Sequence, residues 1–199
     1  PEIMTLVEAI EEVISITKRA DKRTEITSNI NKAIAFWTLK ANFARDLVEY
    51  TMTLDPDEYS QAIDLSLILT RFRKFKFIRP TSRNYFFQPI DPLQVIGPNN
   101  RVQTDRYYVV GQTLNITQSQ LDSTAEIGYY QYAPLLIEGT LEAHWMLDMM
   151  PWAVTERAAS QVFKSIGDEA SSTHYAATSM EFFLAARRDF ADNVADSAS

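Results

Sequence analysis

Cysteine is missing from all 199 residues of the chain, which excludes disulfide bonds, thiolate metal sites and cysteine nucleophiles. Glycine is scarce, with 5 residues, and none of them belongs to a glycine-rich phosphate loop or a Gly-x-Ser-x-Gly turn. The usual sequence scaffolds for nucleotide binding and for serine hydrolysis are therefore missing.

Histidine is rarer still, with 2 residues. His144 and His174 lie far apart in the sequence, without a repeated carboxylate spacing around either. Each is better interpreted as an exposed or helix-packed residue than as a metal ligand or a general base. The carboxylates of Glu11-Glu12 and of residues 55–58 fit a solvated helix face and a turn better than catalysis or calcium binding. We expect no metal, no cofactor and no enzymatic activity; a hydrolase with an unrecognised site is the least favoured alternative.

Long apolar runs and an excess of positive charge are also missing. No window approaches the roughly 18 consecutive apolar residues of a membrane helix, and we expect no signal peptide because no basic and apolar leader is found. The 19 basic residues are outnumbered by 26 acidic ones, giving a net charge of −7. General affinity for nucleic acid is not expected, because it depends on cations that displace counterions. A hydrophobic content of 46% is typical of a folded protein.

What is present begins with two amphipathic helices. Thr5-Leu-Val-Glu8 fits a capping box, in which a hydroxyl and a carboxylate bind free amides at a helix start. Apolar residues then recur at helical spacing in two stripes, separated by the polar link 18–24. The stripes are Leu6, Ile10, Val13, Ile14 and Thr17, followed by Ile26, Ile30, Ala33, Ile34 and Trp37. So short a link predicts that the two helices are antiparallel.

The middle of the chain has the pattern of a β unit. From Arg45 the apolar period changes to two, which predicts a strand with Val48, Tyr50, Met52 and Leu54 on one buried face. Residues 55–57 predict the turn that ends it. Further strands are predicted at residues 65–69, 74–78, 106–110, 114–117 and 126–132, separated by turn residues at 97–100 and Gly111. We expect these strands to be antiparallel.

The helical period returns after Pro134. A short helix is predicted around residues 141–147, and the next helix begins at Pro151, a residue suited to the first helical turn. Gly167 is expected to end that helix and Asp168 to cap the last one. The apolar sides of these two helices are Trp152, Ala159, Val162, Phe163 and Ile166, and Ala176, Ser179, Phe183, Ala186 and Phe190. The small, polar tail after Asn193 is expected to be loose until it meets a partner.

Taken in chain order, these elements predict an α+β protein. Residues 1–43 and 135–199 are expected to form an antiparallel helix bundle from the two ends of the chain. Residues 44–134 are expected to form an antiparallel β domain inserted into that bundle.

One stretch, RFRKFKFIRP at residues 71–80, concentrates cations and aromatic rings. The pattern is typical of a platform for single-stranded nucleic acid, and equally of a half-buried strand. As a strand, it places Phe75 and Phe77 on the inner face and Lys74, Lys76 and Ile78 on the outer one. Phe72 is out of phase, which predicts a bulge near residues 73–74. The strand interpretation is favoured. Its outer cations are expected to meet acidic patches on a neighbouring subunit or another partner protein.

Aromatic residues are the unusual feature of the composition. Core filling is the favoured interpretation, but Tyr107-Tyr108 and Tyr129-Tyr130 each place one ring on either face of a sheet. Rings on a second face are typical of protein interfaces. The candidate interface residues are Arg71, Arg73, Lys74, Lys76, Arg79, Tyr108, Tyr130, Phe182, Arg187, Arg188 and Phe190.

The order of several short motifs carries a family resemblance over roughly Leu6 to Phe190. These are Ile30-Asn-Lys-Ala-Ile34 with Trp37, Tyr107-Tyr-Val-Val-Gly111, Ile127-Gly-Tyr-Tyr130 and Ala133-Pro-Leu-Leu136, followed by Trp145-Met-Leu, Pro151-Trp, Ala158-Ala and Gly167-Asp-Glu169. In this order they resemble the head-to-tail adaptor (connector) proteins of tailed bacteriophages, especially of short-tailed ones.

The resemblance implies a structural protein of the virion neck, assembled in the host cytoplasm. Its partners would be the portal protein, a tail or nozzle protein, and other copies of itself in a ring, of about twelve copies in many such phages. Genomic DNA would pass through the ring without specific binding, and no membrane would be involved. The outer cations of residues 71–79 would meet acidic patches on a neighbouring subunit or on the portal, in preference to DNA passing through the channel. The tail after the last helix is short compared with many adaptors. The alternative function is a module that binds single-stranded nucleic acid through residues 71–79.

Overall fold

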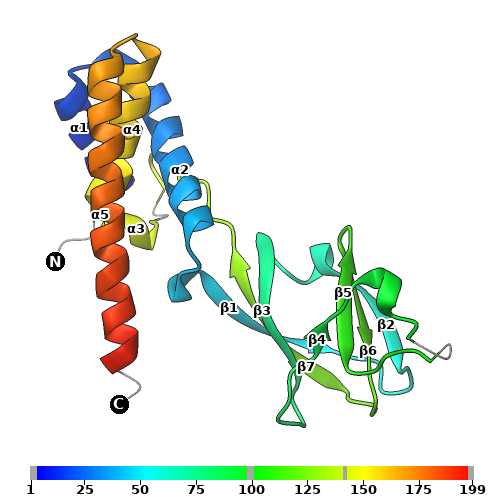
Figure 1. The fold of residues 1–199 in the computed structure, drawn as a ribbon. Coiled ribbons are helices and arrows are strands. Elements are labelled where there is room, and N and C mark those ends of the chain that lie inside the picture. The colour runs from blue at the N-terminus through cyan, green and yellow to red at the C-terminus, as the bar shows by residue number, and fades with distance from the viewer. Residues whose placement is uncertain (1–3, 98–100, 141–142, 197–199) are drawn as a thin grey trace. The chain divides into compact units, whose positions relative to one another are not determined.

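The computed structural model describes the backbone of residues 4–97, 101–140 and 143–196, with side chains in the last helix as far as Arg188. The chain is an α+β protein that divides into two compact units (Figure 1). The helical unit consists of residues 1–42 and 133–199, and the β unit of residues 43–132. The sequence-based division placed the two boundaries at 43/44 and 134/135.

The helical unit begins with the predicted capped helix. Helix α1 spans Leu6–Thr17, and the capping box is formed because Thr5 Oγ1 accepts from the backbone N–H of Glu8 and Glu8 Oε2 accepts from that of Thr5. These hydrogen bonds lower the pKa of Glu8. Lys18 adopts the left-handed conformation with φ 57°, a short 3-10 turn follows at Ala20–Lys22, and α2 spans Arg23–Lys40.

Three further helices complete this unit: α3 at Trp145–Met149, α4 at Pro151–Ser165 and α5 at Glu169–Asp196. The first is shorter and later than predicted; residues 141–142 lie outside the described residues. Pro151 opens α4 as expected. Gly167, with φ 80°, follows the end of α4, and Asp168 Oδ1 accepts from the backbone N–H of Ser171 to cap α5.

The end of α5 differs from the expectation. The helix continues past Asn193 to Asp196, where a loose tail was predicted. The run Ala185-Ala-Arg-Arg188 consists of strong helix formers and propagates the helix toward the C-terminus. Residues 197–199 lie outside the described part of the chain.

The core of the helical unit is built around α4, which contacts α1, α2, α3 and α5. Small residues on α4 allow close approach, and Ser160 Oγ donates to the Ser172 carbonyl of α5 at 2.9 Å. Trp37 of α2 is fully buried, donates from Nε1 to the Ala153 carbonyl at 2.8 Å, and stacks on Phe183. The predicted apolar side of α4 is only partly buried, because Ala159 and Val162 are covered while Trp152 and Ile166 are exposed.

The β unit contains two sheets. The three-stranded sheet has the order β1 (Leu47–Thr53), β7 (Thr124–Gln131) and β3 (Phe72–Pro80). The four-stranded sheet has the order β2 (Ser60–Asp64), β6 (Thr113–Thr117), β5 (Arg106–Val110) and β4 (Gln88–Pro89). All pairs are antiparallel except β4 with β5, which is parallel. The fully antiparallel unit expected from the sequence is therefore corrected at this short pair.

One predicted strand is wrong, and two strands, β2 and the two-residue β4, were not predicted. Residues 65–69 begin as a 3-10 turn, Leu65–Leu67, because Asp64 Oδ1 accepts from the backbone N–H of Ser66 and starts a helical turn. The sequence pattern did not predict strand β2, because the polar residue Gln61 occupies its buried position. The Gln61 amide exchanges two hydrogen bonds with the Asp55 backbone, and this polar residue interrupts the apolar alternation.

The core of the β unit lies between the two sheets. It is formed by Met52, Leu54, Leu65, Leu69, Ile78, Phe87, Leu114, Ile116, Ala125, Ile127 and Tyr129. The face of β1 that was predicted to be buried is buried only in part, because Met52 and Leu54 are covered whereas Tyr50 is 37% exposed. Polar contacts hold the loop after β3 in place. Arg83 forms an ion pair with the nearly inaccessible carboxylate of Asp122, and Ser82 donates a hydrogen bond to the same carboxylate.

Candidate interaction surfaces

The basic strand β3 lies at one edge of the three-stranded sheet and contains two register shifts. The first, between Phe72 and Lys74, is the predicted bulge. The second, between Phe75 and Phe77, was not predicted, and it reverses the faces of the residues after it. Ile78 is consequently in the core with Phe72 and Phe75, so the expected inner position of Phe77 and outer position of Ile78 are both wrong.

The ring of Phe77 lies on the outer face against Gly128 of β7. A Cβ added to Gly128 would come within 2.3 Å of Phe77 Cε1, which is far closer than side chains tolerate. The missing side chain of Gly128 therefore makes the hollow that accepts the ring, and this hollow favours the second bulge. Phe86 packs edge-to-face on Phe77, with ring centroids 5.7 Å apart.

Replacing Gly128 by alanine is expected to lower the free energy of unfolding by about 1–3 kcal/mol, because the Phe77 ring must leave its position. Chemical denaturation of Gly128→Ala, Phe77→Ala and the double variant measures this. If the two residues compete for the same space, the double variant loses less than the sum of the single losses. Additive losses would contradict the contact.

The cations of β3 are engaged to different degrees. Arg79 Nε donates to Glu126 Oε2 at 2.6 Å, and Arg71 Nη2 donates to Gln131 Oε1 at 3.1 Å. Arg73 and Lys74 lie over the ring of Tyr130, at 5.4 and 5.6 Å from its centroid. Lys74 and Lys76 are exposed. A phosphate approaching Arg79 would have to compete with the carboxylate of Glu126.

In the pairs Tyr107-Tyr108 and Tyr129-Tyr130, the two rings lie on opposite faces of the strand, as expected. The second face of β7 is less exposed than predicted. Tyr107 packs toward the core and contacts Phe75 edge-to-face, and burial raises its pKa. Tyr108 is partly exposed. Tyr130, predicted as an exposed interface residue, is buried beneath Arg73 and Lys74. Its ring is therefore already covered by the chain's own cations.

The candidate residues of the helical unit lie on α5. Phe182 is 39% exposed, and its ring faces that of Trp152 on α4, which is 52% exposed, with centroids 6.0 Å apart. Met149 at the end of α3 is exposed as well. We call Met149, Trp152 and Phe182 the aromatic knob. Arg187 and Arg188 are exposed, and the side chain of Phe190 lies outside the described residues.

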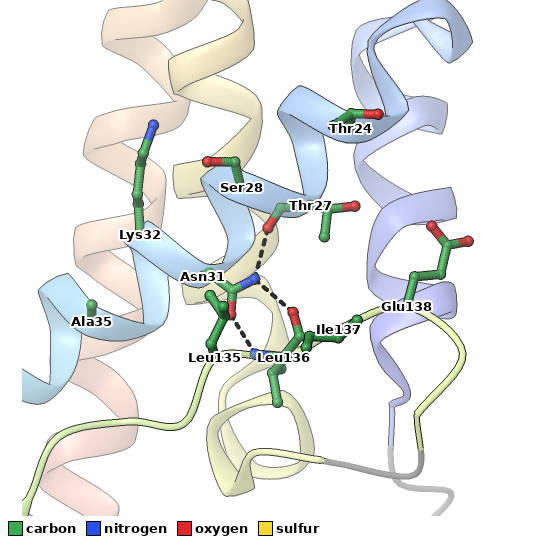
Figure 2. Close-up of a pocket in the computed structure, with 10 residues that line it drawn as sticks. All are labelled: Thr24, Thr27, Ser28, Asn31, Lys32, Ala35, Leu135, Leu136, Ile137 and Glu138. Atoms are coloured by element: carbon green, nitrogen blue, oxygen red, sulfur yellow. Dashed lines mark hydrogen bonds between the residues drawn. The ribbon is translucent and has the colours of Figure 1, made fainter. Parts of the chain in front are cut away.

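A groove on the helical unit was not anticipated from the sequence. It has a volume of ≈ 640 Å³ and runs between α2 and the irregular segment 135–138 (Figure 2). We call it the α2 groove. Polar and small residues of α2 form one side, among them Thr24, Ser28, Lys32 and Ala35. The sequence predicted no helix before residue 141, and the segment 135–138 is accordingly non-helical.

Asn31 fixes the segment against α2. Its Oδ1 accepts from the backbone N–H of Leu136 at 2.8 Å, and its Nδ2 donates to the Leu136 carbonyl at 3.0 Å, as Figure 2 shows. Leu136 is thereby buried, while its neighbours Leu135 and Ile137 are 67% and 54% exposed. The Asn31 amide thus binds the N–H and C=O of Leu136, as a neighbouring strand would. With Leu136 held inward, Leu135 and Ile137 face outward. The apolar run Leu135-Leu-Ile137 was the only trace of this surface in the sequence.

An ion-pair cluster closes one end of the groove. Arg23 Nε donates to Glu138 Oε1 at 2.9 Å and Arg23 Nη1 donates to Glu11 Oε1 at 2.6 Å. The carboxylate of Glu138, and secondarily that of Glu11, raises the pKa of Arg23. The pairs are solvent-exposed, so they orient the segment more than they stabilise it.

The two histidines are separated in role. His144 is buried and caps α3, because its Nδ1 accepts from the backbone N–H of Met146 at 3.3 Å. His174 is exposed on α5. Within residues 4–97, 101–140 and 143–196, no group of three His, Asp or Glu side chains is placed to hold a metal ion. Among these residues there is also no helix of the length and apolarity that crossing a membrane requires.

No model of a known protein family matches the chain, and no curated protein matches it.

Proposed function

We propose that the chain is a structural adaptor of a short-tailed phage virion. It forms a ring between the portal and the tail or nozzle, and the ring is part of the channel through which the genome passes. The protein catalyses no reaction in this role, and it needs no cofactor. The motif order described above supports the proposal, together with the insertion of a β unit between the two ends of a helical unit.

The observation that carries the proposal is the amount of apolar side chain left exposed on the packed helical unit. The aromatic knob and the outward residues of the α2 groove both lie on the helical unit, away from chain ends. Large exposed apolar surfaces on a folded protein are typical of interfaces with other proteins. Aromatic anchors such as Trp152 are the residues that most often dominate such interfaces.

The direct test is co-sedimentation of the purified protein with its portal, followed by negative-stain imaging of the mixture. We expect the adaptor to be a monomer alone and a ring on the portal, because alignment of neighbouring copies costs entropy that portal binding offsets. A mixture in which the two proteins never co-sediment would refute the proposed function.

The end of α5 provides a second test. The last described buried side chain on this helix is Phe183, so deletion of residues 193–199 is expected to leave the unfolding transition of the monomer unchanged. Portal affinity is expected to fall, because we assign the end of this helix to the portal contact. Titration of the portal with the parent and the truncated protein measures the change. Equal affinities would place the portal contact elsewhere.

The cations of β3 are expected to speed assembly. Replacing Arg73, Lys74 and Lys76 by glutamine should slow ring formation on the portal and make its rate less dependent on salt. The reason is that the electrostatic attraction between these cations and acidic patches on the partner is lost. Light scattering at several salt concentrations follows both effects. The matched control replaces the exposed Arg45, Arg101 and Lys164 by glutamine, with the same change in net charge. Equal rates for the two triple variants would contradict a role of β3.

The alternative function, binding of single-stranded nucleic acid through residues 71–79, has less support. The rings of Phe72 and Phe75 pack in the core, and those of Phe77 and Tyr130 are covered by Arg79 and Arg73. Such a platform needs exposed rings on which bases stack. This alternative would replace the adaptor function if the parent protein bound single-stranded DNA with a steep salt dependence, and the glutamine variant lost that binding but still assembled normally.

A further inference from the structure

The α2 groove has the properties of a rigid receptor site. Its floor and rim are fixed by the two hydrogen bonds of Asn31 and by the Arg23 ion pairs, so little order has to be gained when a partner binds. Ala35, Leu135 and Ile137 present apolar surface to solvent, and Leu39, one turn beyond Ala35 on α2, extends it. Lys32 lines the same groove.

The aromatic knob has the properties of the matching ligand. Trp152 and Phe182 project from two helices that are held together behind them by the Ser160–Ser172 contact and by the stacked, buried pair Trp37 and Phe183. Rigid aromatic side chains lose little entropy on binding. The aliphatic side chains of Ala35, Leu135 and Ile137 in the α2 groove offer apolar surface that would cover them.

The unpaired charges beside the two surfaces are of opposite sign. Glu181 precedes Phe182 on α5 and is exposed, and Lys32 is exposed in the groove. Within the described part of the chain neither of them forms an ion pair, whereas Glu138, the acidic residue of the groove, is paired with Arg23. Glu156, one turn after Trp152 on α4, does not contribute to the rim because its Oε2 is buried.

The knob and the groove share no residue and belong to one packed unit. Trp152 and Phe182 do not line the groove and remain 52% and 39% exposed, so the knob of a copy does not occupy that copy's own groove. Two different, complementary surfaces on one chain produce a head-to-tail contact, which generates a ring when the rotation between copies closes.

We propose that the aromatic knob of one copy docks in the α2 groove of the next copy, with Lys32 facing Glu181. The proposal rests on the ring-forming function above and specifies its subunit contact. A second copy is the partner that supplies both a groove with outward aliphatic side chains beside a lysine and exposed aromatic side chains beside a glutamate.

Because the chain has no cysteine, single engineered cysteines can report the contact. Ser28→Cys marks the groove, Met149→Cys marks the knob, and Val7→Cys on α1 is a control of similar exposure to Met149. Under oxidising conditions, a mixture of the first two variants should give a disulfide-linked heterodimer. Either variant alone, or either mixed with Val7→Cys, should give at least about tenfold less. Adding Trp152→Ala to Met149→Cys should reduce the yield about tenfold or more, because an anchor residue is lost.

A charge exchange provides an independent test that does not depend on crosslinking. Because the protein alone is expected to be a monomer at ordinary concentration, self-association is measured by sedimentation at high protein concentration, where the weak contact is populated. Lys32→Glu and Glu181→Lys should each weaken it. The double variant should regain it, and so should a mixture of the two single variants, because each groove then meets a knob of opposite charge. Circular dichroism confirms that these exposed substitutions leave the fold intact.

Efficient crosslinking in the Val7→Cys mixtures, or a Ser28→Cys homodimer as abundant as the heterodimer, would overturn the head-to-tail contact. Failure of the charge exchange to restore association would also overturn it. Portal binding separates the two proposals. If Trp152→Ala rings form on the portal as readily as parent rings, the adaptor function stands and this contact does not. If the crosslinks are specific but the parent never binds a portal, the contact stands and the adaptor function does not.

Discussion

Replacing Asp122 by alanine is expected to lower the free energy of unfolding of the β unit by about 3–5 kcal/mol, the range measured when one partner of a buried ion pair is removed. Its carboxylate is 5% exposed and accepts from Ser82 Oγ and from the Arg83 guanidinium. Hydrogen bonding to Asp122 raises the pKa of Arg83. Without the carboxylate, a largely buried guanidinium has no anionic partner.

Chemical denaturation followed by circular dichroism measures this loss. The control is Asp21→Ala, which removes a partner of the same chemistry from an exposed pair with Arg19. That change should cost less than about 1 kcal/mol, because solvent screens the pair. If the two variants lost equal stability, Asp122 would not be a buried anchor of the loop after β3.

Replacing Trp37 by alanine is expected to have an effect of similar size, about 3–5 kcal/mol, in the helical unit. The indole is fully buried, stacks on Phe183 with centroids 4.3 Å apart, and donates to the Ala153 carbonyl. Its removal leaves a cavity between α2, α4 and α5. Trp37→Phe should cost clearly less, because the ring remains and only the hydrogen bond and part of the volume are lost.

The tryptophans allow the two units to be observed separately. Trp37, Trp145 and Trp152 all belong to the helical unit, so their fluorescence reports that unit alone. If the units unfold independently, Asp122→Ala leaves the fluorescence transition in place, and Trp37→Ala shifts it. A fluorescence transition that moved with Asp122→Ala would show that the units unfold together.

Local signals explain the parts of the fold that could be predicted from the sequence. The capping box of Thr5 and Glu8, the helix start at Pro151 and the cap at Asp168 each depend on a few neighbouring residues. The strand at residues 106–110 was predicted with its bounds, because apolar and aromatic residues lie between turn residues.

The missed features depend on residues far apart in the sequence. The second bulge of β3 follows from the hollow at Gly128, which only strand pairing brings beside Phe77. The α2 groove exists because Asn31 binds the backbone at Leu136 across 105 residues of sequence. Trp152 was predicted to be buried because its position on α4 fits the apolar stripe. Nothing in the local sequence indicates that the neighbouring helices cover only part of this stripe and leave Trp152 exposed.

The position of β3 at the edge of its sheet has a consequence for solubility. An edge strand offers unpaired backbone groups to other chains, and natural proteins prevent such pairing with bulges and charged side chains. This strand has both: two register shifts and the exposed Lys74 and Lys76. Without its cations, the segment from Phe72 to Ile78 would be aromatic, uncharged and free of proline, a composition prone to amyloid-like stacking. The same lysines that are proposed to attract a partner thus also keep the sheets of separate molecules apart.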